Sequence, residues 1–304
     1  KGCLITQGAT EALSLVYTSL HRKLQGQVPV LSFDPAYESF RYLPEVFNNP
    51  YVSFPGIPKS EKDFEHLESV CTAHRIRVIF VASPGNPLGA VWEKESWERI
   101  VNLSEQLGIY LIADLVYKDF YYSEPSVLPN VMTQSHVILT GSFSKMLSIT
   151  GWRLGYVGTS SGLFQEMRQV HDYTGLCAAH PLQYALSKYL QKDGSWRLYL
   201  EHIRERIAQN YEIVSSSLAG MGFRVSPAGG GYFVWAELPE GHYSGLEFAL
   251  QLYDKTQTAV VPGIHFSETA ERYIRLNLAR AEEEISTGLE RIRHFIQTHC
   301  VWEH

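Results

Sequence analysis

The chain has 304 residues, of which 45% are hydrophobic and 19% are charged, and its formal net charge is −6. This length is enough for two domains of about 100–200 residues, each with its own core. No basic tract or apolar run of ~20 residues occurs, so we expect neither a nucleic-acid nor a membrane partner. The four cysteines are far apart and in no metal-ligand spacing, which favours reduced thiols, a cytoplasmic location and no metal site.

Short apolar runs alternate with longer helical ones in the first part of the chain. Residues 9–25 fit a helix, because apolar side chains recur there at helical spacing. Residues 28–32 are predicted to form a strand that is followed by a turn at 33–37. A continuous apolar strand at 78–82 ends at the turn 83–87, which is rich in glycine and proline.

The same alternation continues to about residue 140. A helix is predicted around residues 97–107, and buried strands at 109–113 and 137–140 end before Asp114 and Ser142. This order predicts βαβ units and a mostly parallel sheet. Polar residues follow the carboxyl ends of the strands, and ligands bind at that edge of open α/β sheets.

The pattern changes after about residue 190. The remaining segment contains a long predicted helix, two strands, a helix, a strand and a final amphipathic helix, at about 194–219, 223–226, 232–237, 245–256, 273–278 and 285–296. We therefore predict a large domain at residues 1–190 and a smaller α+β domain at residues 191–304.

Lys145 is the first candidate for a reactive group. It lies in the segment Gly141-Ser-Phe-Ser-Lys-Met, directly after a predicted buried strand. Partial burial makes a lysine amine easier to deprotonate and therefore nucleophilic, which a Schiff-base lysine requires. The alternative is an ordinary solvated lysine on the surface.

Two segments carry groups suited to a phosphate. Residues 151–155 combine glycines, which allow close backbone approach, with the donor-rich guanidinium of Arg153, and Ser142 adds a hydroxyl. Residues 8–12 open a helix, whose free backbone N–H groups and positive dipole end attract anions, and Thr10 adds another hydroxyl. The alternatives are a surface ion pair for Arg153 and simple helix capping for Thr10.

Asp114 ends an apolar strand, where a carboxylate is costly unless it has a partner. A protonated pyridine nitrogen would be such a partner and would keep an aromatic ring electron-poor. Tyr117 follows three residues later and could reach the same ring. A helix cap or an internal ion pair is the alternative for Asp114.

Three motifs, in order, resemble those of class I/II aminotransferases, which are fold-type I pyridoxal-phosphate (PLP) enzymes. The segment Ser83–Gly89 resembles the family's Asn-Pro-x-Gly turn, and Ala113–Tyr117 resembles its Asp-x-x-Tyr motif. The segment Ser142–Gly155 resembles its Ser-x-x-Lys and Gly-x-Arg-x-Gly signature. The resemblance covers nearly the whole chain and implies an α/β, three-layer αβα fold with a smaller C-terminal α+β domain.

The resemblance also implies a role for each candidate residue. Lys145 would bind PLP covalently, and Asp114 would pair with its pyridine nitrogen. Tyr117 and Asn86 would bind the phenolic oxygen of the cofactor. Tyr37 would stack on the ring, although core packing is its alternative. The phosphate would be held by Ala9, Thr10, Ser142 and Arg153.

Arg275 is the candidate for binding the substrate. In the predicted strand, alternation places Ile274, Leu276 and Leu278 on one face and Arg275 on the other. Arg275 resembles the family's arginine for the substrate α-carboxylate, a contact that guanidinium geometry makes bidentate, with Asn86 also at the substrate. Without the resemblance it would be an exposed strand residue.

The implied activity is transfer of an amino group between an L-amino acid and a 2-oxo acid by a ping-pong mechanism, with Lys145 as the general base. The resemblance further implies a homodimer and, because the chain begins almost at the phosphate-binding turn, a preceding N-terminal segment. The expected substrate is a neutral amino acid. Two alternatives remain open: a PLP lyase or decarboxylase, and the ligand-sensing domain of a transcription regulator.

Overall fold

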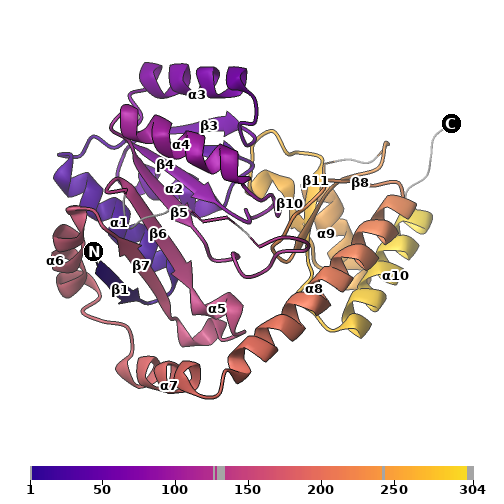
Figure 1. The fold of residues 1–304 in the computed structure, drawn as a ribbon. Coiled ribbons are helices and arrows are strands. Elements are labelled where there is room, and N and C mark those ends of the chain that lie inside the picture. Colours follow the sequence, from indigo (N-terminus) through magenta and orange to yellow (C-terminus); the bar gives the residue numbers. More distant parts are fainter. Residues whose placement is uncertain (1, 126, 129–133, 242–243, 300–304) are drawn as a thin grey trace.

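The computed structural model describes residues 2–125, 127–128, 134–241 and 244–299, which form two units, each built on a β-sheet (Figure 1). The larger sheet has the strand order β1-β7-β6-β5-β4-β2-β3 and the smaller one β10-β11-β9-β8. The strands of the larger sheet are β1 (Gly2–Thr6), β2 (Val30–Asp34), β3 (Tyr51–Pro55), β4 (Val78–Ala82), β5 (Tyr110–Asp114), β6 (Val137–Ser142) and β7 (Gly155–Thr159). Those of the smaller sheet are β8 (Arg224–Val225), β9 (Phe233–Glu237), β10 (Val261–Pro262) and β11 (Tyr273–Asn277).

The larger sheet is mostly parallel, as predicted. Its neighbours β3, β2, β4, β5 and β6 pair in parallel, whereas β7 runs antiparallel to both β6 and β1. The carboxyl ends of β2, β4, β5 and β6 therefore lie at the same edge of the sheet. This edge carries the residues of the site described below.

Helices cover both faces of the larger sheet and give it three layers. One face packs against α1 (Ala9–Lys23), α2 (Glu38–Val46) and α6 (Leu163–Thr174), and the other against α3 (Glu61–Ala73) and α4 (Lys94–Gln106). Alternate residues of each central strand enter the two cores, so both faces of the strands are buried. This double burial explains why the strands read as continuous apolar runs.

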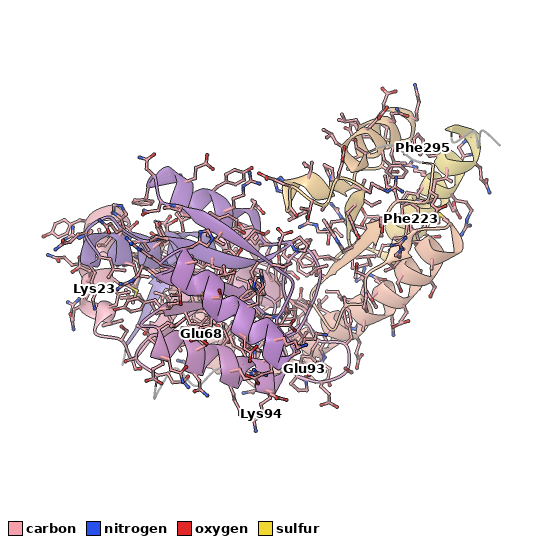
Figure 2. All side chains as sticks on the ribbon, turned by 90° about the horizontal axis from the view of Figure 1, so that it is seen from above. Lys23, Glu68, Glu93, Lys94, Phe223 and Phe295 are labelled. Atoms are coloured by element: carbon pink, nitrogen blue, oxygen red, sulfur yellow. The ribbon has the colours of Figure 1, made fainter. Side chains whose placement is uncertain are left out.

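The smaller sheet packs against α8 (Ser195–Gly220), α9 (Gly245–Thr256) and α10 (Glu282–His299) around a separate core. Figure 2 shows this unit, which carries Phe223 and Phe295, as a lobe beside the larger one. The short α5 (Phe143–Met146), α7 (His180–Gln191) and the start of α8 share a further cluster. We propose a domain boundary near residues 190/191, because α7 ends there. No helix in the described ranges has the length and apolarity needed to cross a bilayer.

Some predicted boundaries differ from the structure. β2 begins and ends two residues later than expected, because Phe33 is buried in the core and Asp34 pairs in register with Pro55. We did not predict β3, an edge strand whose side chains are largely exposed or half-buried and which therefore lacks a continuous apolar run. The helices α8, α9 and α10 lie where the sequence predicts them.

Candidate active site

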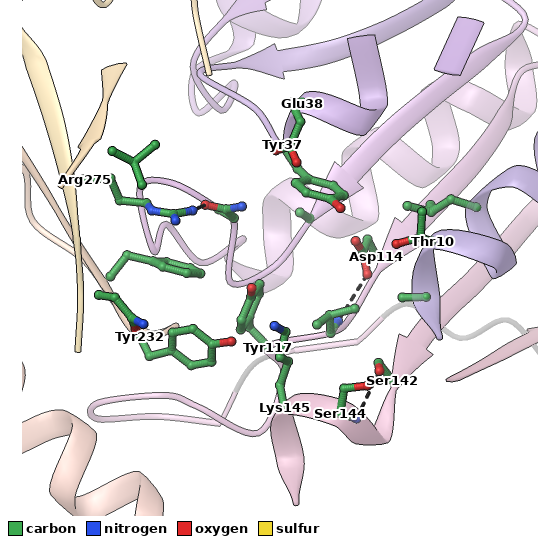
Figure 3. A pocket seen from close by; sticks show the side chains of 18 of the residues that line it. Thr10, Tyr37, Glu38, Asp114, Tyr117, Ser142, Ser144, Lys145, Tyr232 and Arg275 are labelled. Carbon is green, nitrogen blue, oxygen red and sulfur yellow. Dashed lines mark hydrogen bonds between the residues drawn. The ribbon is translucent and has the colours of Figure 1, made fainter. Parts of the chain in front are cut away.

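A cavity of about 470 Å³ opens at the carboxyl edge of the larger sheet and reaches β9 and β11 of the smaller one. Its volume is typical of small-molecule sites. All the residues predicted for the site line it, namely Ala9, Thr10, Tyr37, Asn86, Asp114, Tyr117, Ser142, Lys145, Arg153 and Arg275. Figure 3 shows Arg275 at one end and Thr10 and Ser142 at the other, with Asp114, Tyr117 and Lys145 between them.

One end of the cavity is built to receive an anion. The N-cap of α1 is Gly8, and no side chain caps the helix. The first turn of α1 therefore has backbone N–H groups available at the place where Ala9 and Thr10 line the cavity. This geometry excludes simple capping by Thr10. Arg153 makes no ion pair within the described residues, and its guanidinium lies against Gly8, where an added Cβ would be 2.3 Å from Nη2.

Gly155 brings the strand β7 into direct contact with this helix end. A Cβ at Gly155 would lie 2.4 Å from the carbonyl carbon of Gly8 and 2.7 Å from the nitrogen of Ala9. Both atoms belong to the backbone and cannot move aside cheaply. The close approach predicted from the glycines therefore occurs at Gly155 but not at Gly151, where an added Cβ would meet nothing within 4 Å.

A Gly155→Ala variant is expected to weaken the affinity for the cofactor phosphate at least ~10-fold, because the methyl group displaces the first turn of α1. Gly158→Ala is the matched control, since it lies in the same strand and its added Cβ would meet nothing within 4 Å. Titration of both apo-proteins with PLP, followed by fluorescence quenching, measures the two affinities. Equal affinities would contradict this view of the anion site.

Asp114 occupies the middle of the cavity without a cationic partner. Its carboxyl is buried, accepts a hydrogen bond of 3.2 Å from the backbone N–H of Val116, and makes no ion pair within the described ranges. Burial raises the pKa of Asp114 to about 7, although the bond from Val116 opposes the shift. Such a group is suited to share a proton with a basic nitrogen of a ligand.

An aromatic pair lies beside Lys145. Its Nζ lies 5.7 Å from the centre of the Tyr232 ring, and Tyr232 packs edge-on against Tyr117 with 5.0 Å between the ring centroids. Burial raises the pKa of Tyr117 well above its usual value, and Tyr232 adds to the effect. Tyr117 therefore stays protonated at neutral pH and can donate a hydrogen bond into the cavity.

Arg275 is held rigidly at the opposite end. Its Nη1 donates a 2.7 Å hydrogen bond to Oδ1 of Asn86, and its guanidinium carbon lies 5.0 Å and 4.8 Å from the ring centres of Phe233 and Phe266. The buried Nε has no partner within the described part of the chain. Burial lowers the pKa of Arg275, whereas the charge of Glu38 raises it. The arginine thus presents oriented, unused donors to a carboxylate.

Several cavity residues were not among the predicted ones. They are Leu13, Glu38, Ala82, Val116, Ser144, Tyr232, Phe233, Val261, His265 and Asn277. Tyr232 and Phe233 follow a run of three glycines, and that run was the available signal. It permits close packing, since a Cβ at Gly230 would lie 2.2 Å from the carbonyl oxygen of Phe120. Glu38 and His265 gave no signal in the sequence, because neither stands in a recognisable motif.

The residues present fit PLP. The uncapped helix end with Arg153 suits a phosphate, and the unpaired buried carboxyl of Asp114 suits a protonated ring nitrogen. Lys145 lies in the same cavity and can reach an aldehyde. Among the residues that the structure describes, no cluster of acidic, histidine or cysteine side chains could hold a metal ion.

Comparisons with known proteins agree with this fold. The sequence profile described as "Aminotransferase class I and II" matches residues 2–292. An aspartate aminotransferase of Pyrococcus horikoshii is 29% identical over 301 residues, which cover 97% of this chain and 75% of that protein. The aromatic-amino-acid aminotransferase 2 of Thermococcus litoralis is 24% identical over 299 residues, which cover 97% of this chain and 76% of that protein.

Solved structures show the same architecture. The crystal structure of an aromatic aminotransferase from Pyrococcus horikoshii superposes with a TM-score of 0.87 at 25% identity, covering 97% of this chain and 79% of that one. The fold and cavity thus define a fold-type I enzyme of the PLP-dependent class. The chain belongs to the class I and II aminotransferase family.

Proposed function

We propose that this chain binds PLP in the cavity and moves an amino group between an L-amino acid and a 2-oxo acid in two half-reactions. The observation that carries the proposal is the convergence of Lys145, Asp114 and Arg275 from different elements on one cavity. Thr10 and Ser142 lie at one end of the pocket, Asp114 lies in the middle and Arg275 at the other end, which is the order in which a phosphate, a ring and a substrate carboxylate would follow one another. Family membership supports amino-group transfer.

The bound cofactor would supply an aldehyde that accepts an amino group and a ring that accepts electrons. The protein supports this chemistry with fixed groups. The α1 N-terminus, Ser142 and Arg153 would hold the phosphate, and Asp114 would hold a proton on the ring nitrogen. Tyr117 would donate to the phenolic oxygen, and so would an amide N–H of Asn86, because the Oδ1 of Asn86 accepts from Arg275.

The substrate enters between Arg275 and Lys145. Arg275 binds and orients its α-carboxylate, and this fixes the direction in which the Cα–H bond points. Lys145 Nζ would take the proton from Cα as the general base and then give it up again as the general acid. Release of the oxo acid before the second substrate binds gives ping-pong kinetics.

Arg275→Gln is expected to lower kcat/KM at least about 10²-fold, mainly through KM, because the carboxylate loses a charged, bidentate partner. Arg275→Lys should recover only part of this loss, since an ammonium cannot form the fork. Arg224→Gln is the control: it is an exposed arginine in the same sheet, outside the cavity. Steady-state kinetics with varied amino donor would measure these effects, and an unchanged KM for Arg275→Gln would contradict the assignment.

The function itself is tested by a screen of amino donors. Single-turnover absorbance would follow conversion of the cofactor to its amine form, and chromatography would detect a new amino acid after addition of a 2-oxo acid. A PLP lyase or decarboxylase would instead release ammonia, thiol or CO₂ without oxo-acid dependence. A ligand-sensing domain would bind PLP and an amino acid without turnover.

We further propose a homodimer. The surface around α7 exposes large apolar side chains, namely Tyr173, Leu176, Tyr184 and Leu198, with exposed fractions of 60–87%. Exposed large apolar side chains that gather on one surface are typical of an interface between proteins. Sedimentation of the PLP-loaded protein that gave monomer alone would contradict the dimer.

A further inference from the structure

The charges at the substrate end of the cavity limit which side chains it can accept. Three lysine or arginine side chains line the cavity in the described part of the chain, namely Lys145, Arg153 and Arg275, and the imidazole of His265 lines it as well. In the proposed function, Lys145 and Arg153 serve the cofactor, and Arg275 serves the α-carboxylate. No further lysine or arginine among the described lining residues is left for a second carboxylate.

The remaining charged group at this end is an acid. Glu38 is the first residue of α2 and directly follows Tyr37, so the start of the helix carries its carboxylate into the cavity wall (Figure 3). Its side chain is 28% exposed, and its Oε2 lies 3.7 Å from Nε2 of His265. Within the described residues no hydrogen bond reaches this carboxylate. His265 is more exposed, at 48%, and so screens Glu38 only in part.

Glu38 also acts on Arg275. Its negative charge is among the influences that raise the pKa of Arg275 against the effect of burial. Both side chains line the same cavity, so a substrate bound to Arg275 also experiences the charge of Glu38. When Arg275 holds the α-carboxylate of a substrate, the substrate's side chain lies in the electrostatic field of Glu38. A second carboxylate is repelled there, and a neutral or cationic group is not.

We propose that Glu38 is a specificity-determining residue that restricts the amino donor to monocarboxylic amino acids, whose side chains are neutral or cationic. This inference rests on the proposed function, because it assumes that Arg275 binds the α-carboxylate. It differs from the dicarboxylic substrate in the name of the Pyrococcus relative. Glu38 acts through its negative charge, so replacing it with an uncharged residue of the same shape should remove the selection against dicarboxylic amino donors.

The test compares aspartate, norvaline and ornithine as amino donors with the PLP-loaded wild-type protein and Glu38→Gln. We expect the wild type to have a lower kcat/KM for aspartate than for the other two. Glu38→Gln should raise the ratio of aspartate to norvaline about 5-fold and lower the ratio of ornithine to norvaline by a similar factor. Glu45→Gln is the control, because this exposed glutamate of α2 lies outside the cavity and its loss changes the net charge equally.

Binding provides a readout that does not require turnover. Calorimetry would compare maleate, a dicarboxylate, with butyrate, and Glu38→Gln should tighten maleate binding about 5-fold relative to butyrate. A wild type that prefers aspartate to norvaline, or ratios that Glu38→Gln leaves unchanged, would overturn the inference while amino-group transfer still holds. A protein that converts none of the donors, but in which Glu38→Gln still tightens maleate relative to butyrate, would refute the proposed function while supporting the repulsion of a second carboxylate by Glu38.

Discussion

A Lys145→Ala variant is expected to lose at least about 10⁴-fold in the rate of the first half-reaction. Lys145 has two tasks in the proposed function, since its amine binds the cofactor and then carries the proton from Cα. Alanine removes both, and the cavity offers no second amine among its described lining residues. Single-turnover absorbance with a saturating amino donor measures the rate.

A covalent readout separates the role of Lys145 from a general loss of folding. Borohydride treatment of the PLP-loaded wild type should leave a pyridoxyl group on the peptide that contains residue 145, and mass spectrometry would locate it. Lys94→Ala is the matched control, because this lysine is exposed, forms an ion pair with Glu98 across one helical turn and lies outside the cavity. A reducible adduct that persists undiminished in Lys145→Ala would refute the assignment.

The sequence was most informative where a strand ends. A strand buried on both faces reads as an unbroken apolar run, so the first polar residue after it marks the carboxyl edge of the sheet. Asp114 and Lys145 were identified in this way, and both line the cavity. Arg275 was identified through the family resemblance, whereas strand alternation only placed it on the face opposite Ile274 and Leu278, both of which the structure puts in the core of the smaller unit.

The contacts between segments that are far apart in the chain could not be predicted from the sequence. Glu38 and His265 are 227 residues apart, and nothing local relates a glutamate after a tyrosine to a histidine in a 3₁₀ turn. Their contact depends on how the loop after β10 lies against the start of α2. The hydrogen bond from Arg275 to Asn86 likewise joins the two units across 189 positions. Side-chain pairs of this kind follow from the tertiary structure alone.

The free energy of unfolding of the cofactor-free protein should depend on pH through the titration of Asp114. Its pKa is about 7 in the folded protein, against an ordinary value of 3.8. Between these values the unfolded chain has lost the proton while the folded chain keeps it, so the free energy of unfolding falls as pH rises through this window. The stability that the folded protein gains by keeping this proton is fully present below pH 3.8 and is lost above about pH 7.

Asp114→Asn removes the titration while keeping the shape of the side chain. The variant should therefore gain about 2–4 kcal/mol relative to the apo wild type between pH 4.5 and pH 8. Denaturant unfolding of both apo-proteins at several pH values measures this difference, and other titrating groups cancel in the comparison. A difference that stays constant with pH would show that Asp114 does not hold a proton in the cavity.

Asp114→Asn stabilises the empty protein, but it should impair the protein once PLP is bound. The carboxylate of Asp114 then has the partner that the apo-protein lacks, because a protonated ring nitrogen stabilises its charged form in the buried site. Asparagine cannot hold that proton, so Asp114→Asn is expected to lower kcat about 10²–10³-fold, the loss typical of one preorganised charged contact. The same substitution would thus stabilise the empty protein at pH 8 and disable the loaded one. A variant that is stabilised when empty yet fully active when loaded would show that Asp114 is buried next to the ring without serving its nitrogen.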